Sequence, residues 1–199
     1  CELIQERGSM KKGEIALEDL AKGYRTFLSR ADRDLYSRLC SGQSPHTLVI
    51  GCSDSRVVPE EIFSAKPGDL FVLRNVGNLC CIDNPSVASA IEYAVEHLHV
   101  GRILVLSHSD CGAVMAARDP AHLDGAIRTW LCNEECNGAQ LEDAIKSWGI
   151  CQLERVKSHP LVKKACEDGR LDLTLAFFDL ASLRLELYSD EGWHAVPRS

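Results

Sequence analysis

Two short segments of the chain contain side chains that could bind a metal ion, and each of them follows an apolar run. Cys52 lies in the segment GCSDSR at residues 51–56, and His108 and Cys111 lie in the segment SHSDCG at residues 107–112. Two thiolates and an imidazole form a donor set that suits zinc, and three protein ligands leave the fourth tetrahedral position open. Because an open position is typical of catalytic zinc, the two segments predict a catalytic centre with one Zn2+ per chain.

The elements that must position these ligands are predicted to alternate between strands and helices. Residues 47–52, 70–76 and 102–107 form continuous apolar runs, which are typical of strands buried on both faces of a parallel sheet. Residues 85–100, between the last two runs, have helical periodicity, begin at a proline and are followed by a glycine. This strand–helix–strand unit should have a right-handed crossover.

The rest of the chain completes an α/β fold. Further helices are expected at residues 14–29, 32–39, 113–118, 124–131, 140–158 and 160–167, and further strands at 171–179 and 183–188. The predicted fold is α/β with a Rossmann-like, mostly parallel central sheet of about four parallel strands plus an antiparallel edge strand, flanked by helices and preceded by an N-terminal helical arm. We expect residues 1–12 to be a disordered terminus or a cloning scar, and residues 13–199 to form one catalytic domain.

The predicted topology also says where the ligands should meet. In open α/β sheets, ligands gather beyond the carboxyl ends of the strands, at the point where the strand order reverses. If the strands at 47–52 and 102–107 are neighbours, Cys52, His108 and Cys111 converge at one edge of the sheet.

The composition excludes several classes of protein. The 199 residues include 22 Lys and Arg against 29 Asp and Glu, for a net charge of −7, which argues against nucleic acid or an anionic membrane as a partner. No apolar run approaches the roughly 18 residues needed to cross a bilayer, and the start does not read as a signal peptide. No GxGxxG motif follows a strand, which excludes a dinucleotide-binding site.

The ten cysteines need a separate interpretation. Without a leader sequence, most of them are expected to be reduced, so the protein should reside in the cytoplasm, or in an organelle stroma or matrix after removal of a transit peptide. Cys132 and Cys136, with the pair Cys80 and Cys81, could indicate a second metal site or a redox switch. The alternative, which we favour, is that they are small buried apolar residues. Trp130 and Trp148 are interpreted as packing residues.

The chain resembles the β-class carbonic anhydrases along nearly its whole length from about residue 14. The resemblance rests on motifs that occur in the family's order: CSDSRVVPE at 52–60, PGD at 67–69, RNVGN at 74–78, IEYAV at 91–95, HSDCG at 108–112 and SHPLV at 158–162. It implies a carbonate dehydratase, which interconverts CO2 with bicarbonate and a proton by attack of zinc-bound hydroxide. It also implies a doubly wound sheet assembled as a homodimer or a dimer of dimers.

Asp54 and Arg56 are the predicted catalytic pair. Asp54 lies two residues past a ligand, close enough to accept the hydrogen of the hydroxide and direct its lone pair at CO2. Arg56 can hold this carboxylate ionised through a charge-assisted pair. The alternative is an ordinary surface ion pair.

Tyr93 and His97 match family positions near the mouth of the pocket. They are four residues apart on the predicted helix and therefore share a face, so His97 could pass protons to buffer. The alternative for His97 is a partly exposed helix histidine without a role.

The sequence departs from the family at some positions. Some members bind a second, non-catalytic bicarbonate with a Trp, an Arg and a Tyr. Arg74 matches the Arg, but Val49 and Phe178 replace the Trp and the Tyr, so two donors are missing and we expect no such site. Lys66 stands where plant members place a Gln near the substrate.

Two rival functions remain at this point. A hydrolase of carbonyl sulfide or carbon disulfide would use the same ligands and the same Asp–Arg pair. A zinc-binding scaffold without catalysis would be expected to close the tetrahedron with a fourth ligand, and to have no need of Asp54 and Arg56.

Overall fold

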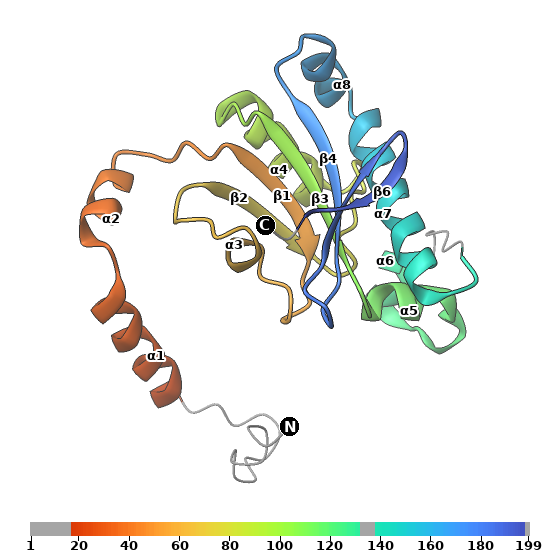
Figure 1. Cartoon of the computed structure of the whole chain (residues 1–199), viewed down its shortest axis with the longest axis horizontal. Coiled ribbons are helices and arrows are strands. Elements are labelled where there is room, and N and C mark those ends of the chain that lie inside the picture. The colour runs from red at the N-terminus through yellow and green to blue at the C-terminus, as the bar shows by residue number, and fades with distance from the viewer. Residues whose placement is uncertain (1–16, 132–137, 198–199) are drawn as a thin grey trace. The chain divides into compact units, whose positions relative to one another are not determined.

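The computed structural model describes residues 17–131 and 138–197. Contacts divide the chain into two compact units, Cys1–Ser41 and Gly42–Ser199 (Figure 1). The terminus expected to be disordered, at residues 1–12, lies outside the described residues, as do Cys132 and Cys136. The assignment of residues 13–199 to one catalytic domain stays a prediction.

The first unit contains two amphipathic helices, α1 (Leu17–Arg30) and α2 (Arg33–Leu39), neither of which has a buried residue. The two helices meet edge to face at the rings of Phe27 and Tyr36, whose centroids are 5.8 Å apart. The apolar stripe of α1 stays exposed in the single chain: Leu17 is 82% and Tyr24 60% exposed. A stripe of this kind normally stabilises a helix only when it packs against a partner surface.

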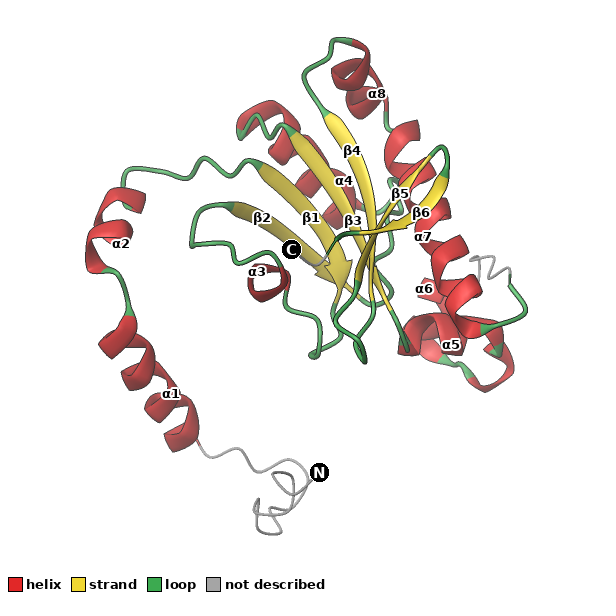
Figure 2. Ribbon diagram, viewed as in Figure 1, coloured by secondary structure: helices red, strands yellow, loops and turns green. Residues whose placement is uncertain are grey.

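The second unit is built on one six-stranded sheet with the order β2-β1-β3-β4-β5-β6 (Figure 2). Four strands are parallel and the last two are antiparallel, which confirms the predicted fold class. The bounds in chain order are β1 (Thr47–Cys52), β2 (Leu70–Asn75), β3 (Arg102–His108), β4 (Asp172–Phe178), β5 (Leu185–Ser189) and β6 (Gly192–Ala195). The sequence did not predict β6, whose four residues are too few to show a period.

Burial on both faces follows from the position of a strand in the sheet. In β1, Leu48 and Ile50 pack into one apolar cluster and Val49 packs into another on the opposite face, so all six residues of β1 are buried. The prediction of burial on both faces is also correct for β3 beyond its first residue. It is wrong for β2, which is only half-buried because it is an edge strand in the single chain.

Helices cover the sheet unequally. The cluster on one face combines β1, β3 and β4 with α4 (Pro85–Glu92), α7 (Leu141–Ser158) and α8 (Pro160–Glu167). The other face carries the short helix α3 (Pro59–Ile62), which the sequence did not predict. Three short helices follow β3 directly: α5 (Gly112–Arg118), η2 (Pro120–His122) and α6 (Gly125–Leu131).

The helix predicted over residues 85–100 is interrupted. After α4 the chain widens into a π-helical turn, η1 (Tyr93–His97), in which the Leu98 N–H donates to the Tyr93 carbonyl at 3.0 Å. Such turns widen the spacing between side chains and often lie at functional or packing irregularities. Apolar periodicity cannot reveal one, because it reports the buried face and not the hydrogen-bond register.

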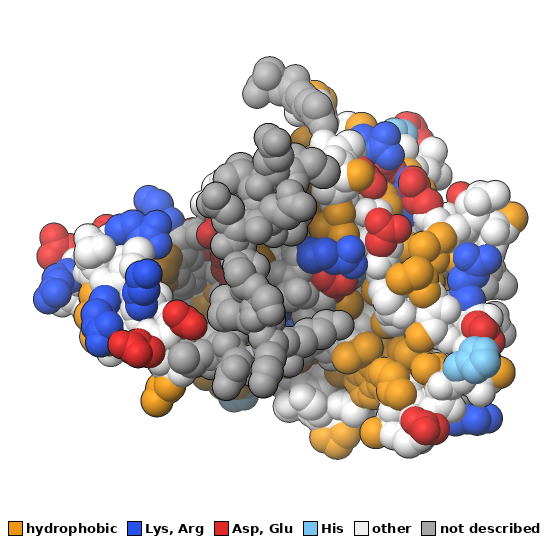
Figure 3. Space-filling view, turned by 90° about the horizontal axis from the view of Figure 1, so that it is seen from below, with side chains coloured by type: hydrophobic (Ala, Val, Ile, Leu, Met, Phe, Trp, Pro, Cys, Tyr) orange, Lys and Arg blue, Asp and Glu red, His pale blue; other side chains and the backbone are white. Residues whose placement is uncertain are grey.

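The surface of the described residues carries both signs of charge, as expected from a sequence with 22 basic and 29 acidic residues (Figure 3). On the face shown in Figure 3, basic and acidic side chains are interspersed. Within residues 17–131 and 138–197, no helix is both long enough and apolar enough to span a bilayer.

Candidate metal centre

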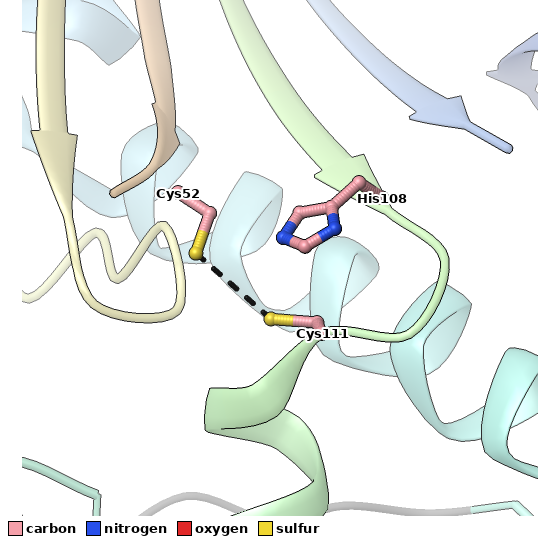
Figure 4. A group of neighbouring side chains, drawn as sticks. All are labelled: Cys52, His108 and Cys111. Atoms are coloured by element: carbon pink, nitrogen blue, oxygen red, sulfur yellow. Dashed lines mark hydrogen bonds between the residues drawn. The ribbon is translucent and has the colours of Figure 1, made fainter. Parts of the chain in front are cut away.

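The structure brings the three predicted ligands together at the point where strand order reverses. The chain passes from β1 to β2 on one side and then to β3 on the other, so β1 and β3 are neighbours. Cys52 is the last residue of β1, His108 is the last residue of β3, and Cys111 precedes α5 (Figure 4). All three residues are buried, and their ligand atoms lie within 4.8 Å of one another.

The donor set fits zinc in spacing and in chemistry. The two sulfur atoms are 4.0 Å apart, and two thiolates about 2.3 Å from a tetrahedral zinc ion would be separated by roughly 3.8 Å. His108 Nδ1 lies 2.8 Å from the Ser109 carbonyl oxygen, which can only accept, so Nδ1 carries the proton. Nε2 therefore presents a lone pair, and it is buried without a hydrogen-bond partner. A metal ion would satisfy this atom.

The pKa values of the two thiols are shifted in opposite directions. The Cys111 side chain is the main cause that lowers the pKa of Cys52; burial opposes this, and His108 and nearby backbone groups reinforce it. The pKa of Cys111 is raised, chiefly by its hydrogen bond with Cys52 and also by burial. The contact between the two sulfurs thus favours ionisation of Cys52 over that of Cys111. Binding of a metal by both sulfurs as thiolates would release any proton that they hold in the metal-free protein.

Asp54 and Arg56 form the predicted pair with two-point geometry. Arg56 donates from Nε to Oδ1 of Asp54 at 2.9 Å and from Nη2 to Oδ2 at 2.7 Å, while its backbone N–H donates to Oδ1 at 3.0 Å. The side chain of Asp54 is 17% exposed and that of Arg56 is 52% exposed. The Arg56 guanidinium holds the pKa of Asp54 well below its usual range. Arg56 also donates to the Asp110 carbonyl, which links the two ligand-bearing loops.

Arg74 has a role that the sequence did not reveal. It lies on β2 opposite Gly51 and donates from Nε to the Cys52 carbonyl at 2.9 Å and from Nη2 to the Asp54 carbonyl at 2.7 Å. Its guanidinium thus fixes the turn that carries both the ligand and the carboxylate. Its position opposite Gly51 could have indicated this role, but only if the pairing of β1 with β2 had already been known.

Tyr93 and His97 lie far along the strands from the metal centre of their own chain. Their rings contact each other, with centroids 5.2 Å apart, and the ring of Tyr93 contacts Phe71 at 5.9 Å. Phe71 pairs with Leu48, four residues before Cys52, a separation of roughly 13 Å along an extended strand. Both Tyr93 and His97 are exposed.

The other residues discussed in the sequence analysis differ in how far they are buried. Val49 and Phe178, at the positions of the missing donors, are buried in one apolar cluster. Lys66 is exposed. The seven described cysteines are free thiols; Cys80 is buried as expected, whereas Cys81 is half-buried.

Comparisons with known proteins agree with this site. A family model described as carbonic anhydrase matches residues 47–185, which include both ligand-bearing segments. A carbonic anhydrase of Pseudomonas aeruginosa is 37% identical over 190 residues, covering 85% of this chain and 86% of that protein. The solved β-carbonic anhydrase CcaA superposes with a TM-score of 0.84 at 28% identity, covering 90% of this chain and 98% of that chain. One of two tetrameric β-carbonic anhydrases from Sordaria macrospora superposes with a TM-score of 0.75 at 25% identity, covering 90% and 96%.

Proposed function

This chain belongs to the β-class carbonic anhydrase family, whose reaction is the reversible hydration of CO2, and from that premise we propose that it performs the reaction with one Zn2+ held by Cys52, His108 and Cys111. The observation that supports this best is the buried Nε2 of His108, which lacks a partner and belongs to a group of three donors within 4.8 Å. A buried imidazole nitrogen without a partner is costly unless a ligand satisfies it.

The metal and its ligands would have distinct tasks. Zinc held by three protein ligands lowers the pKa of a water molecule to about 7 and so supplies hydroxide at neutral pH. The hydrogen bond from His108 Nδ1 to the Ser109 carbonyl sets the tautomer and the direction of the ring, as is usual for metal-binding histidines.

Asp54 would orient the nucleophile, and Arg56 would keep Asp54 fit for that task. Because the pKa of Asp54 is depressed, its carboxylate is ionised throughout the neutral range and can only accept. It would accept the hydrogen of the attacking hydroxide and leave the oxygen lone pair directed at the carbon of CO2. The two-point pair with Arg56 restricts rotation of the carboxylate.

The assignment of proton transfer to Tyr93 and His97 stays a prediction. In their own chain, these side chains are separated from Cys52 by four register positions of β1, so direct transfer within the chain has no geometric support. An exposed histidine can still exchange protons with buffer at neutral pH.

We also propose that the chain acts as a homo-oligomer, either a dimer or a dimer of dimers. The similar Sordaria macrospora proteins are tetrameric, and the exposed apolar stripe of α1 is a surface that a second copy could cover. We expect no nucleic acid or membrane partner. Location in the cytoplasm, or in an organelle stroma or matrix, remains our expectation; the free thiols of the described cysteines suit a reducing compartment.

The test is CO2 hydration followed by stopped flow with a pH indicator, from about pH 6.5 to 9. We expect zinc-loaded protein to hydrate CO2 faster as pH rises, chelated protein to lose this activity, and added Zn2+ to restore it. Chelated His108→Ala should regain neither stoichiometric zinc nor activity. Absence of hydration by the zinc-loaded chain at every pH would refute the proposal. No observation favours the alternative hydrolysis of carbonyl sulfide or carbon disulfide.

A further inference from the structure

Two tryptophans donate hydrogen bonds to the loop that follows β2, directly beside the metal centre. Trp130 Nε1, from α6, donates to the Val76 carbonyl at 2.8 Å, and Trp148 Nε1, from α7, donates to the Gly77 carbonyl at 2.7 Å. Trp148 is 1% exposed and packs in the same apolar cluster as Cys52 and Cys111. The interpretation of both tryptophans as packing residues is therefore incomplete.

The same loop adjoins a predicted ligand. Cys52 pairs in register with Asn75, the last residue of β2, and the Ser53 N–H donates to the Asn75 carbonyl at 2.9 Å. After the Cys111 and His108 side chains, the Gly77 backbone also lowers the pKa of the Cys52 thiol, which indicates that its N–H faces the sulfur. That N–H belongs to the peptide group whose carbonyl is the Val76 carbonyl, which accepts from Trp130. In a trans peptide group the N–H and the C=O point in opposite directions, so an indole on one side directs the N–H toward the sulfur on the other. Donation to the carbonyl also polarises the group and strengthens its N–H as a donor.

Trp148 fixes the next peptide group and restricts the residue between the two groups. Gly77 has a φ of +82°, and a Cβ added there would lie 3.0 Å from the Ala113 Cβ and 3.2 Å from the Trp148 Cζ2. Only glycine fits this conformation and this space without displacing its neighbours. Both peptide groups that flank the Gly77 Cα are thus held by indole N–H groups, and the orientation of the donor to Cys52 is determined from both sides.

We propose that Trp130 and Trp148 are positioning residues for the ligand Cys52, acting through the two peptide groups that flank Gly77. A hydrogen bond to a metal-binding thiolate spreads its charge and fixes its direction, and groups beyond the ligands commonly change metal affinity. The two indoles would therefore tune zinc affinity without touching the metal. This inference rests on the zinc site of the proposed function.

The test measures metal binding by the full chain, independently of activity. Trp130→Phe and Trp148→Phe each remove one N–H and retain an aromatic ring, and Trp193→Phe is the matched control. Trp193 lies on β6 against the rings of Phe177 and Tyr188, whereas the indole hydrogen bonds to the Val76 and Gly77 carbonyls come from Trp130 and Trp148. Zinc affinity is measured by competition with a chelator. The sulfur-to-metal charge-transfer band of the Co2+-loaded protein reports on the thiolates directly.

We expect zinc affinity to fall about tenfold in Trp148→Phe, and less in Trp130→Phe, where water can reach the half-buried site and replace the lost donor. The cobalt band should shift in both variants, and neither property should change in Trp193→Phe. Replacing Trp148 by benzothienylalanine, which has sulfur in place of the indole N–H, keeps the ring volume and should reproduce the loss. This replacement guards against a Trp148→Phe variant that does not fold.

Two results would overturn the inference. In the first, Trp130→Phe and the variant with benzothienylalanine at position 148 have the same zinc affinity and the same cobalt band as the Trp193→Phe control. The other is loss of thermal stability in the metal-free variants with unchanged metal affinity, which would mean that the indoles only pack. If instead the unaltered chain binds no zinc, the proposed function itself fails, and the two failures are thereby distinguished.

Discussion

The two ends of the parallel sheet hold charged and titratable groups in different ways. At the carboxyl ends of β1 and β3, the ligands are buried and the carboxylate of Asp54 accepts hydrogen bonds at both oxygens. At the amino ends, charged groups form exposed pairs such as Arg102 with Asp172, at 3.2 Å, and the His97 ring lies exposed against Tyr93.

This difference separates a preorganised site from an ordinary solvated surface. Groups at the carboxyl end are held by several contacts each, which is what positioning for catalysis requires. Exposed pairs at the amino end are screened by water and contribute little. The comparison predicts that substitutions at the carboxyl end will have large effects and that matched substitutions at the amino end will have small ones.

Asp54→Asn should give the largest effect among substitutions that leave the ligands intact. The amide has nearly the same shape but donates from one position, so it cannot orient hydroxide as a carboxylate does, and we expect kcat to fall about 100-fold. CO2 hydration by stopped flow measures this, with zinc content checked for each sample. Asp172→Asn, at the amino end, should keep full activity; an equal loss in both variants would contradict the comparison.

Lys146→Gln should destabilise the protein more than Lys157→Gln, although both lysines lie on α7. Lys146 Nζ bonds Glu142 and Glu186 at 2.7 Å, with Glu186 only 9% exposed, and lies 4.8 Å from the centre of the Phe177 ring. Its loss removes one of the two cationic partners of the buried Glu186 carboxylate, which keeps Arg184 at 2.7 Å, and breaks a charge-assisted hydrogen bond at a cost of about 2 kcal/mol. Lys157 pairs with Glu154 at 2.6 Å in solvent, and its loss should cost about 0.3 kcal/mol. Urea unfolding measures both, and equal losses would mean that burial of the partner carboxylate does not matter.

His97→Ala should reduce CO2 hydration by less than about threefold, because an exposed histidine far along the strand competes with buffer as a proton acceptor. The measurement is kcat at low and at high buffer concentration. A larger loss at low buffer that imidazole restores would establish His97 as a proton shuttle. That outcome would show that the amino end takes part in catalysis.

Arg56→Gln should release Asp54 and lower activity, and it should also cause a small loss of stability that depends on pH. The folded-state pKa of Asp54 is depressed below its unfolded value of about 3.9, so the pair stabilises the fold above that pH and this contribution is lost as pH falls through the folded pKa. The urea midpoints of the unaltered protein and the variant should therefore differ at pH 7, begin to converge below about pH 4, and meet only below the depressed pKa of Asp54. A difference that persists at low pH would mean that Arg56 stabilises the fold by other contacts.

Much of the carboxyl end could be predicted from the sequence. The apolar runs of β1 and β3 end directly at Cys52 and His108, so a parallel pairing of these strands was enough to bring the ligands together. The pair of Asp54 and Arg56 is local in sequence and needed only the turn after β1. Motifs of this kind are predictable because short-range geometry and chain order determine them.

Contacts that depend on long-range placement could not be predicted. The indole of Trp148 reaches the Gly77 carbonyl across 71 residues, and Arg74 reaches the Cys52 carbonyl across 22. Apolar periodicity marks these side chains as buried or exposed but does not say which backbone group they bind. The π-helical turn at Tyr93 and the half-buried edge strand β2 were missed for the same reason, since each depends on packing in three dimensions.

The candidate ligands Cys52 and Cys111 are 59 positions apart in the chain and meet only when β1 pairs with β3. A folding chain must close this long loop before the metal can bind at full strength, and non-local pairings of parallel strands form slowly. Binding of the proposed metal would then draw the equilibrium toward the native state by mass action. The supply of zinc during synthesis should therefore set the yield of folded protein as well as its activity.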